Sequence, residues 1–231
     1  LVPNAEFKIF NIDKNEYVKQ YTTYPSKVEH TSFFTDEDGD LILPEALKIG
    51  NYRIEEVKAP FGYVVNDNYI NISVDTDTAF ETDGDTNDAI ITVEYSDAPA
   101  VGELTVEKKG EVLDGFKGGL FANSEDKEFV YKEGSLAGAV FKVYAAEDIF
   151  TADNQKDADG NRIKYYSKGD LVATLTTEKD GKAVAKNLPL GQYRVVEVTA
   201  PDGYVLNPNE QKVTFTYVDD KTPVIKESLT F

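Results

Sequence analysis

The chain has 231 residues, of which 41% are hydrophobic and 12% aromatic, enough for one large core or two ordinary ones. Its 42 acidic residues outnumber 24 lysines and arginines, and the resulting net charge of −18 argues against nucleic acid or an anionic membrane surface as a partner. Cysteine is absent, which excludes disulfides, cysteine nucleophiles and thiolate metal sites.

Two further absences concern the setting of the protein. No apolar run of about 18 residues is present that could span a bilayer, so we expect no membrane insertion. Methionine is absent even from position 1, and we therefore expect the chain to be a processed or excised segment.

Short segments that alternate apolar and polar residues predict half-buried β-strands along the chain. Turn-forming clusters separate them, for example DEDGD at 36–40 and PDG at 201–203. Many short strands with frequent turns favour antiparallel sandwiches, and only 44–50 and 145–150 suggest short helices. In chain order the predicted strands include 5–10, 91–95, 103–109, 139–144, 171–177 and 212–217.

One phrase occurs twice, as YRIEEVKAPFGYVVN at 52–66 and as YRVVEVTAPDGYVLN at 193–207. The segments before and after it repeat in the same order, which predicts two tandem copies of one small sandwich. The first copy, residues 1–100, lacks its first strand. The second copy, residues 101–231, has a polar, glycine-containing insertion at about 112–134 and a truncated last strand.

Four segments resemble the CnaB-type (SpaA-like, prealbumin-like) domains of Gram-positive pilins and surface adhesins. The resemblance covers nearly the whole chain and implies an all-β fold of two tandem antiparallel, Ig-like β-sandwiches. It also implies an extracellular, cell-surface location, with anchoring to the cell wall through segments outside this chain. The segments are VPNAEFKIF (2–10), GNYRIEEVKAPFGY (50–63), LAGAVFKVY (136–144) and DGKAVAKNLPLGQYRVVEVTAPDGYVLN (180–207).

The resemblance further implies that each domain cross-links itself through an isopeptide bond. A lysine on the first strand attacks the side-chain carbonyl of an Asn or Asp on the last strand, assisted by a buried Glu that precedes Ala-Pro-x-Gly-Tyr. On the matching positions, Lys108 is the nucleophile, Asp97 the acceptor, and Glu56 and Glu197 are the proton shuttles.

Strand alternation supports these assignments independently of the resemblance. Lys108 is in phase with the apolar residues of its strand, and Glu56, Glu197 and Asp97 are in phase with those of theirs, so all four would point into a core. Desolvation lowers the pKa of a lysine and raises that of a glutamate, which favours a neutral amine beside a protonated acid. The acid then donates a proton to the acceptor oxygen and relays protons to the leaving group.

The leaving group is water from an Asp acceptor and ammonia from an Asn acceptor. Rigid strands supply the effective molarity, so the reaction requires no cofactor. Each residue also has an ordinary interpretation: Lys108 as a snorkelling surface lysine, the glutamates as solvated side chains before a turn, and Asp97 as a turn residue ahead of Ala98-Pro99.

Neither copy contains a complete set of reacting groups. The first copy has no first-strand lysine, because Lys8 lies on the second strand and is out of phase with Phe7 and Ile9. The second copy has no acceptor, because Phe231 occupies the place of Tyr95. We therefore expect the missing lysine before Leu1 and the missing acceptor about two residues after Phe231, unless another chain supplies the strand.

The favoured function is structural: stalk or shaft modules of a cell-surface pilin or adhesin, next to neighbouring domains of the same protein or pilus. The alternative is an adhesive module that binds a host protein or glycan through loops, with Phe116 and Phe121 of the insertion as candidates. A turnover enzyme has no supporting motif. We expect no metal, because His30 is the single histidine and the acidic stretches at 36–40 and 75–88 lack the bidentate glutamate of an EF-hand loop.

Overall fold

The computed structural model describes residues 3–76, 81–82, 89–118 and 128–231, which form strands, turns and irregular segments. The all-β prediction is confirmed. The short helices predicted at 44–50 and 145–150 are wrong. Both stretches are too short to offset the cost of helix nucleation, and the backbone of Glu45 instead bonds the side-chain amide of Gln20, at 2.7 and 3.1 Å.

The chain forms two compact units. Unit 1 comprises residues 1–100 and 218–223, and unit 2 comprises residues 101–217 and 224–231. Of the ladders between described strands, all are antiparallel except one, in which β12 pairs with β22 in parallel.

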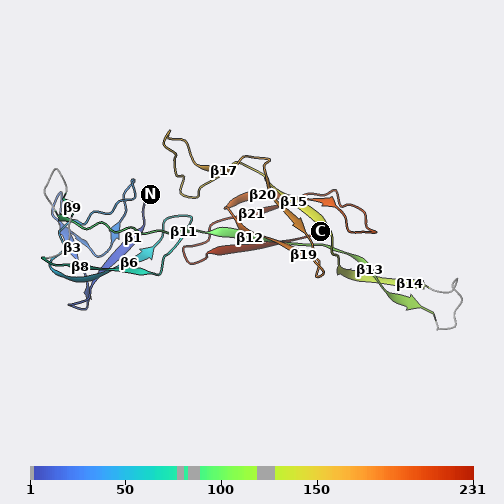
Figure 1. Cartoon of the computed structure of the whole chain (residues 1–231), viewed down its shortest axis with the longest axis horizontal. Helices are drawn as coiled ribbons and strands as arrows, with labels where there is room; N and C mark the ends of the chain where they lie inside the picture. Colours follow the sequence, from blue (N-terminus) through green and yellow to red (C-terminus); the bar gives the residue numbers. More distant parts are fainter. Residues whose placement is uncertain (1–2, 77–80, 83–88, 119–127) are drawn as a thin grey trace. The chain divides into compact units, whose positions relative to one another are not determined.

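Unit 2 is a sandwich of two sheets (Figure 1). Three strands form one sheet in the order β19-β12-β22, and four strands form the other in the order β18-β15-β20-β21. Two separate two-stranded ribbons, β13-β14 and β16-β17, accompany them. The strands are β12 (Val101–Glu107), β13 (Lys109–Lys117), β14 (Glu128–Ser135), β15 (Val140–Ala145), β16 (Ile149–Phe150), β17 (Lys164–Tyr166), β18 (Leu171–Thr176), β19 (Lys182–Leu188), β20 (Gly191–Thr199), β21 (Gln211–Phe215) and β22 (Val224–Thr230).

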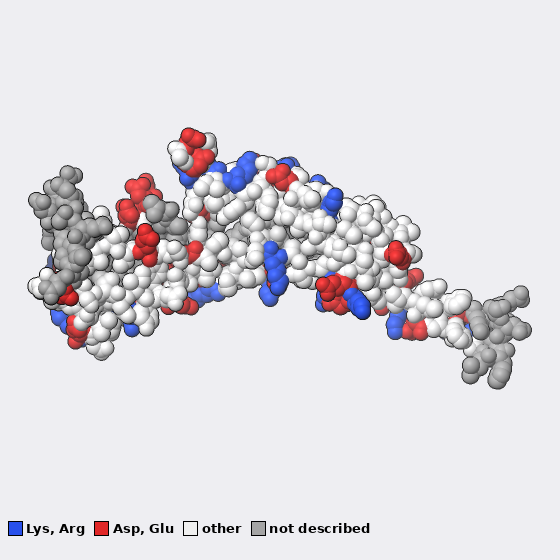
Figure 2. Space-filling view, viewed as in Figure 1, with Lys and Arg blue, Asp and Glu red and all other residues white. Residues whose placement is uncertain are grey.

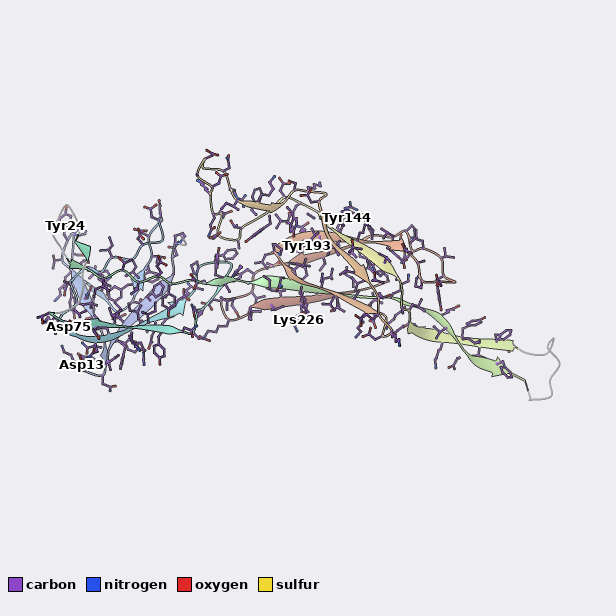
Figure 3. The ribbon with its side chains drawn as sticks, in the orientation of Figure 1. Asp13, Tyr24, Asp75, Tyr144, Tyr193 and Lys226 are labelled. Carbon is purple, nitrogen blue, oxygen red and sulfur yellow. The ribbon has the colours of Figure 1, made fainter. Side chains whose placement is uncertain are left out.

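The core of unit 2 lies between these two sheets, and sixteen buried residues of its described part form one cluster there. Alternation places every second residue of β12 and β20 in it, so β20 presents Tyr193, Val195 and then Glu197 to the interior. Figure 3 labels Tyr193, whose hydroxyl donates a hydrogen bond to the carbonyl oxygen of Pro189 at 2.6 Å. This geometry holds the turn before β20 against the core.

Unit 1 has one larger sheet in the order β2-β1-β6-β8, with β5 also paired to β1. The pairs β3-β4, β7-β11 and β9-β10 are separate. Its strands are β1 (Glu6–Asn11), β2 (Glu16–Tyr17), β3 (Gln20–Thr22), β4 (Val28–His30), β5 (Phe33–Phe34), β6 (Gly50–Lys58), β7 (Tyr63–Val64), β8 (Tyr69–Val74), β9 (Glu81–Thr82), β10 (Ala89–Ile90) and β11 (Ala98–Pro99).

The prediction of a strand at 91–95 is wrong, because residues 91–97 form no strand. The equivalent β22 of unit 2 pairs with β12, and no described segment of unit 1 occupies the place of β12. Residues 40–47, which correspond to β19, form no strand for the same reason. The tyrosine bond is nevertheless repeated, because the Tyr52 hydroxyl donates to the carbonyl oxygen of Lys48 at 2.8 Å.

The insertion expected at about 112–134 contains regular structure. Its described residues lie in the antiparallel ribbon of β13 and β14, which extends away from the two sheets of unit 2 (Figure 1). Lys109 pairs with Ser135 at the base of the ribbon, and Lys117 pairs with Glu128 further out.

Acidic and basic side chains are interspersed in small groups over the face drawn in Figure 2. Ion pairs link neighbouring strands of unit 2, such as Lys132 with Asp114 on the β13–β14 ribbon and Lys226 with Glu103 between β22 and β12. The described part of the chain contains no helix that is long and apolar enough to cross a membrane.

Candidate functional site

Unit 2 holds a buried lysine and glutamate in direct contact. Lys108 follows the last residue of β12, Glu197 lies on β20 in the facing sheet, and each exposes 5% of its surface. The Lys108 Nζ lies 3.0 Å from Oε1 and 3.1 Å from Oε2 of Glu197. Because burial of a single charge is costly, the two groups depend on each other.

The backbone holds Lys108 at this position. Its N–H donates to the carbonyl oxygen of Gly181 at 2.8 Å, and its own carbonyl accepts from the N–H of Leu136 at 2.9 Å. Gly181 has a φ of +74°, and a Cβ there would lie 2.8 Å from the Lys108 carbonyl oxygen, so this close approach requires glycine.

The end of β22 lies beside the same lysine. The N–H of Phe231 donates to the Glu107 carbonyl, and the Phe231 carbonyl accepts from the N–H of Lys109, both at 2.8 Å. The ring of Phe231 packs on that of Phe141, with centroids 4.8 Å apart. Phe231 thus takes the inward position level with Lys108, and the next inward position on this line falls two residues later.

Unit 1 repeats the frame of this site with different groups. Glu56 on β6 is 6% exposed and pairs in register with Phe7, as Glu197 pairs with Phe141 in unit 2. The ring of Tyr95 packs on the ring of Phe7, with centroids 5.1 Å apart, as Phe231 packs on Phe141 in unit 2. Asp97, two residues after Tyr95, is half-buried and faces the carboxyl of Glu56.

The carboxyls of Glu56 and Asp97 strongly influence each other's protonation. Burial, opposed in part by the hydrogen bond from the Asn66 N–H and assisted by the charge of Asp97, raises the pKa of Glu56 from 4.5 to about 7. Burial also raises the pKa of Asp97. Glu56 Oε1 and Asp97 Oδ1 are buried without a hydrogen-bond partner, so a proton between the two carboxyls is what relieves the pair.

The structure thus brings together Lys108 with Glu197 in unit 2, and Glu56 with Asp97 in unit 1. Lys8 does not join the pair in unit 1, because its Nζ lies 5.5 Å from the centroid of the Tyr17 ring on the other face of β1.

Sequence reasoning missed two residues of the site, Asn66 and Asn207. Each donates its main-chain N–H to the glutamate of its unit, at 2.8 Å to Glu56 Oε2 and 2.7 Å to Glu197 Oε2. The signal was the asparagine that ends both copies of the repeated phrase, at the same distance after the glutamate.

Other candidate features have simpler explanations. Within the described ranges, no group of three or more His, Cys, Asp or Glu side chains gathers to hold a metal ion. In the 36–40 turn, the Asp36 carboxylate accepts the N–H groups of Asp38 and Asp40, which is the role of a turn aspartate. His30 contacts the Thr22 hydroxyl at 3.0 Å.

The aromatic residues expected in the insertion are partly described. Phe116 is 50% exposed, and its cross-strand neighbour Phe129 is 59% exposed. Leu113 and Tyr131 form a second exposed cross-strand pair on the same ribbon. Phe121 lies outside the described residues.

Comparisons with known proteins found the following similarities. The chain is similar to the trypsin-resistant surface T6 protein of Streptococcus pyogenes serotype M6, with 26% identity over 148 residues that cover 58% of this chain and 22% of that protein. Among solved structures, the Bacillus anthracis TIE protein matches 99% of this chain and 30% of its own at 24% identity and a TM-score of 0.50. The minor pilin GBS52 of Streptococcus agalactiae matches 99% of this chain and 82% of its own at 17% identity and a TM-score of 0.32.

The chain therefore spans less than a third of the T6 and TIE proteins, and the TIE likeness concerns the fold alone. The family model described as "SpaA: Prealbumin-like fold domain" matches residues 1–89 and 127–228, which is most of the chain. The chain belongs to the SpaA family of prealbumin-like fold domains.

Proposed function

We propose that this chain forms two structural modules, residues 1–100 and 101–231, in the stalk or shaft of a Gram-positive cell-surface protein or pilus. Each module is stapled by an amide bond that its own side chains form. The observation that carries the proposal is the buried contact of Lys108 with Glu197, since a lysine without such chemistry belongs at the surface. Neighbouring modules of the same surface protein are the expected partners, outside the cell.

In unit 2, Lys108 is the nucleophile and Glu197 the proton shuttle. The ammonium gives a proton to the Glu197 carboxylate, and the free electron pair of Nζ attacks the side-chain carbonyl carbon of an Asn or Asp. Glu197 protonates the carbonyl oxygen and then passes protons to the leaving group, so that a C–N amide bond forms and ammonia or water departs. The acceptor belongs two residues after Phe231, at the next inward position beside Lys108.

In unit 1, Asp97 is the acceptor and Glu56 the shuttle. The raised pKa of Glu56, about 7, supports its role as a carboxylic acid near neutral pH. The lysine comes from a strand that lies between residues 40–47 and 91–97 and precedes Leu1, or from another chain. That strand would pair with two segments that have no ladder in unit 1.

Intact mass tests the proposal. The protein with its natural flanking residues should weigh one water or ammonia less than calculated for each module, and peptide sequencing should find Lys108 in the cross-linked fragment. Glu56→Ala and Glu197→Ala should each abolish the mass deficit of their own module. Glu55→Ala is the matched control, because Glu55 neighbours Glu56 but bonds Tyr17 and Arg53. A parent protein of full calculated mass refutes the stapling mechanism.

The exposed ribbon favours a second candidate function, adhesion to a host protein or glycan. Exposed apolar side chains on one protruding ribbon are typical of interaction sites, and here they are Leu113, Phe116, Phe129 and Tyr131. The test replaces residues 112–132 by Asn-Gly and compares binding to immobilised host extracellular proteins and a glycan array. A parent that binds nothing on either surface removes this candidate.

A further inference from the structure

The two glutamates have two inequivalent carboxyl oxygens, and the difference is the same in both units. In each unit Oε2 accepts the main-chain N–H of the asparagine ten residues later, Asn66 for Glu56 and Asn207 for Glu197. In each unit Oε1 is buried and accepts no hydrogen bond. In both copies of the fold, therefore, a main-chain N–H is bound to one carboxyl oxygen of the glutamate, and the other oxygen is available to carry a proton.

A short turn fixes the direction of these N–H groups. The side-chain oxygen of Asn66 accepts the N–H of Asn68 at 3.1 Å, and that of Asn207 accepts the N–H of Asn209 at 3.0 Å. Such a bond to the residue two positions on defines an Asx turn. The residue between the asparagines differs between the copies, so the common feature is Asn-x-Asn.

We propose that this Asn-x-Asn turn is a positioning device, which holds Oε2 as the hydrogen-bonded oxygen and makes Oε1 the oxygen that carries the transferable proton. The inference rests on the proposed amide-forming function. Asn66 and Asn207 touch no reacting atom and are positioning residues.

The contacts of unit 2 support this division of labour. Lys108 Nζ lies 3.0 Å from Oε1 of Glu197 and donates a hydrogen bond to Oε2 at 3.1 Å, so the proton that the ammonium must lose before it attacks is within reach of both oxygens. The proton on Oε1 then goes to the acceptor's carbonyl oxygen and, when the intermediate collapses, to the departing nitrogen or oxygen. Oε2 already accepts hydrogen bonds from the Asn207 N–H and the Lys108 ammonium, whereas Oε1 accepts none, so Oε1 is the oxygen with a free lone pair for the transferable proton.

The same N–H tunes the acidity of the shuttle in unit 1. The Asn66 N–H stabilises the ionised carboxylate and so opposes the burial that raises the pKa of Glu56. Without that bond the carboxyl would stay protonated to higher pH, and a smaller fraction of it would be ionised and able to take the ammonium proton. A shuttle works in both directions only when its pKa lies near the working pH.

A carboxyl titration by NMR on this chain tests the inference without any amide bond. The Asp97→Asn background leaves Glu56 as the one titrating carboxyl of the Glu56–Asp97 pair. We expect Asn66→Ala to raise the pKa of Glu56 by roughly one pH unit, and Asn66→Ser, whose hydroxyl accepts the same turn bond, to restore part of the difference. Asn68→Ala is the matched control, because it keeps the main-chain N–H that closes the turn.

In the unsubstituted turn, the Asn66 amide proton should shift with the same midpoint as the Glu56 carboxyl. An Asn66 amide that ignores this titration overturns the proposal, and so does an unchanged pKa in a folded Asn66→Ala chain. If that variant does not fold, the amide-proton titration alone decides. Because neither readout needs the cross-link, the inference and the stapling mechanism fail separately.

Discussion

Lys108 and Glu197 stabilise unit 2 only as a pair, since each would be an uncompensated charge in the core without the other. We expect Glu197→Ala to lower the free energy of unfolding of unit 2 by about 3–5 kcal/mol. Urea titration followed by circular dichroism or tyrosine fluorescence measures it, as the chain contains no tryptophan.

The double variant Lys108→Met with Glu197→Leu is the control for that loss. Replacing a buried ion pair by apolar side chains of similar size is often neutral or stabilising, so the double variant should unfold within about 1 kcal/mol of the parent. If Glu197→Ala is as stable as the parent, then Lys108 and Glu197 do not compensate each other's charge in the core.

The carboxyl pair of unit 1 predicts a pH dependence of opposite sign to ordinary acid denaturation. Because the folded pKa of Glu56 is about 7 and its ordinary value is 4.5, the folded state binds more protons in this window. The stabilisation is fully present below about pH 4.5 and is lost as the pH rises through about 7. The urea concentration at the midpoint of unit 1 unfolding should therefore decrease as the pH is raised from about 4.5 to about 7. In Glu56→Gln this decrease should be smaller.

At this scale, the phase of the strands was sufficient to find the buried glutamates and Lys108. It was not sufficient to find the roles of Asn66 and Asn207, because the contact comes from a main-chain N–H that any residue except proline could supply. The contact of Asp97 with Glu56 joins two segments that are far apart in the sequence. Strand alternation predicts which face a residue is on, but it does not predict the distance of that residue from another strand.

Among the elements, residues 91–97 and β22 have equivalent places but different hydrogen bonding. β22 pairs with β12 over seven positions, whereas 91–97 belongs to no ladder. Backbone N–H groups outside a ladder exchange through small local openings. We therefore expect amides of 91–97 to exchange at least about tenfold faster than those of 224–230 in hydrogen-exchange mass spectrometry.

Addition of the first strand gives the control for that comparison. In a longer chain that contains the strand before Leu1, the amides of 91–97 and 40–47 should become protected, while those of 224–230 should not change. Equal protection in this chain would mean that 91–97 has a hydrogen-bonded partner.

The strand predictions succeeded where the partner lies within the same unit. The alternation at 5–10 and 139–144 predicted β1 and β15, each of which has strands on both sides. The prediction at 91–95 failed because a strand needs a partner for its N–H and C=O groups, and alternation contains no information on that partner. The helices at 44–50 and 145–150 failed because local propensity is weak over so few residues.

For the whole molecule, the two units should unfold in separate steps. Among the described residues, the buried hydrophobic cluster of unit 1 consists of Ile9, Phe33 and Tyr52, while that of unit 2 has sixteen members. Since stability follows buried apolar area, unit 1 should unfold at lower urea concentration than unit 2. Two transitions by NMR, with peaks of unit 1 lost first, are the expected result. One shared transition for peaks of both units contradicts it.

The parallel ladder of β12 and β22 also determines how unit 2 carries a mechanical load. Tension that enters at Val101 and leaves beyond Phe231 runs along two adjacent strands from opposite ends, so it shears their hydrogen bonds together instead of opening them one at a time. Seven paired positions then share the load. An amide from Lys108 to the residue two positions after Phe231 would join the C-terminal ends of β12 and β22, which lie side by side. The pull would pass from backbone to backbone through covalent bonds, and the rest of the sandwich would stay unloaded.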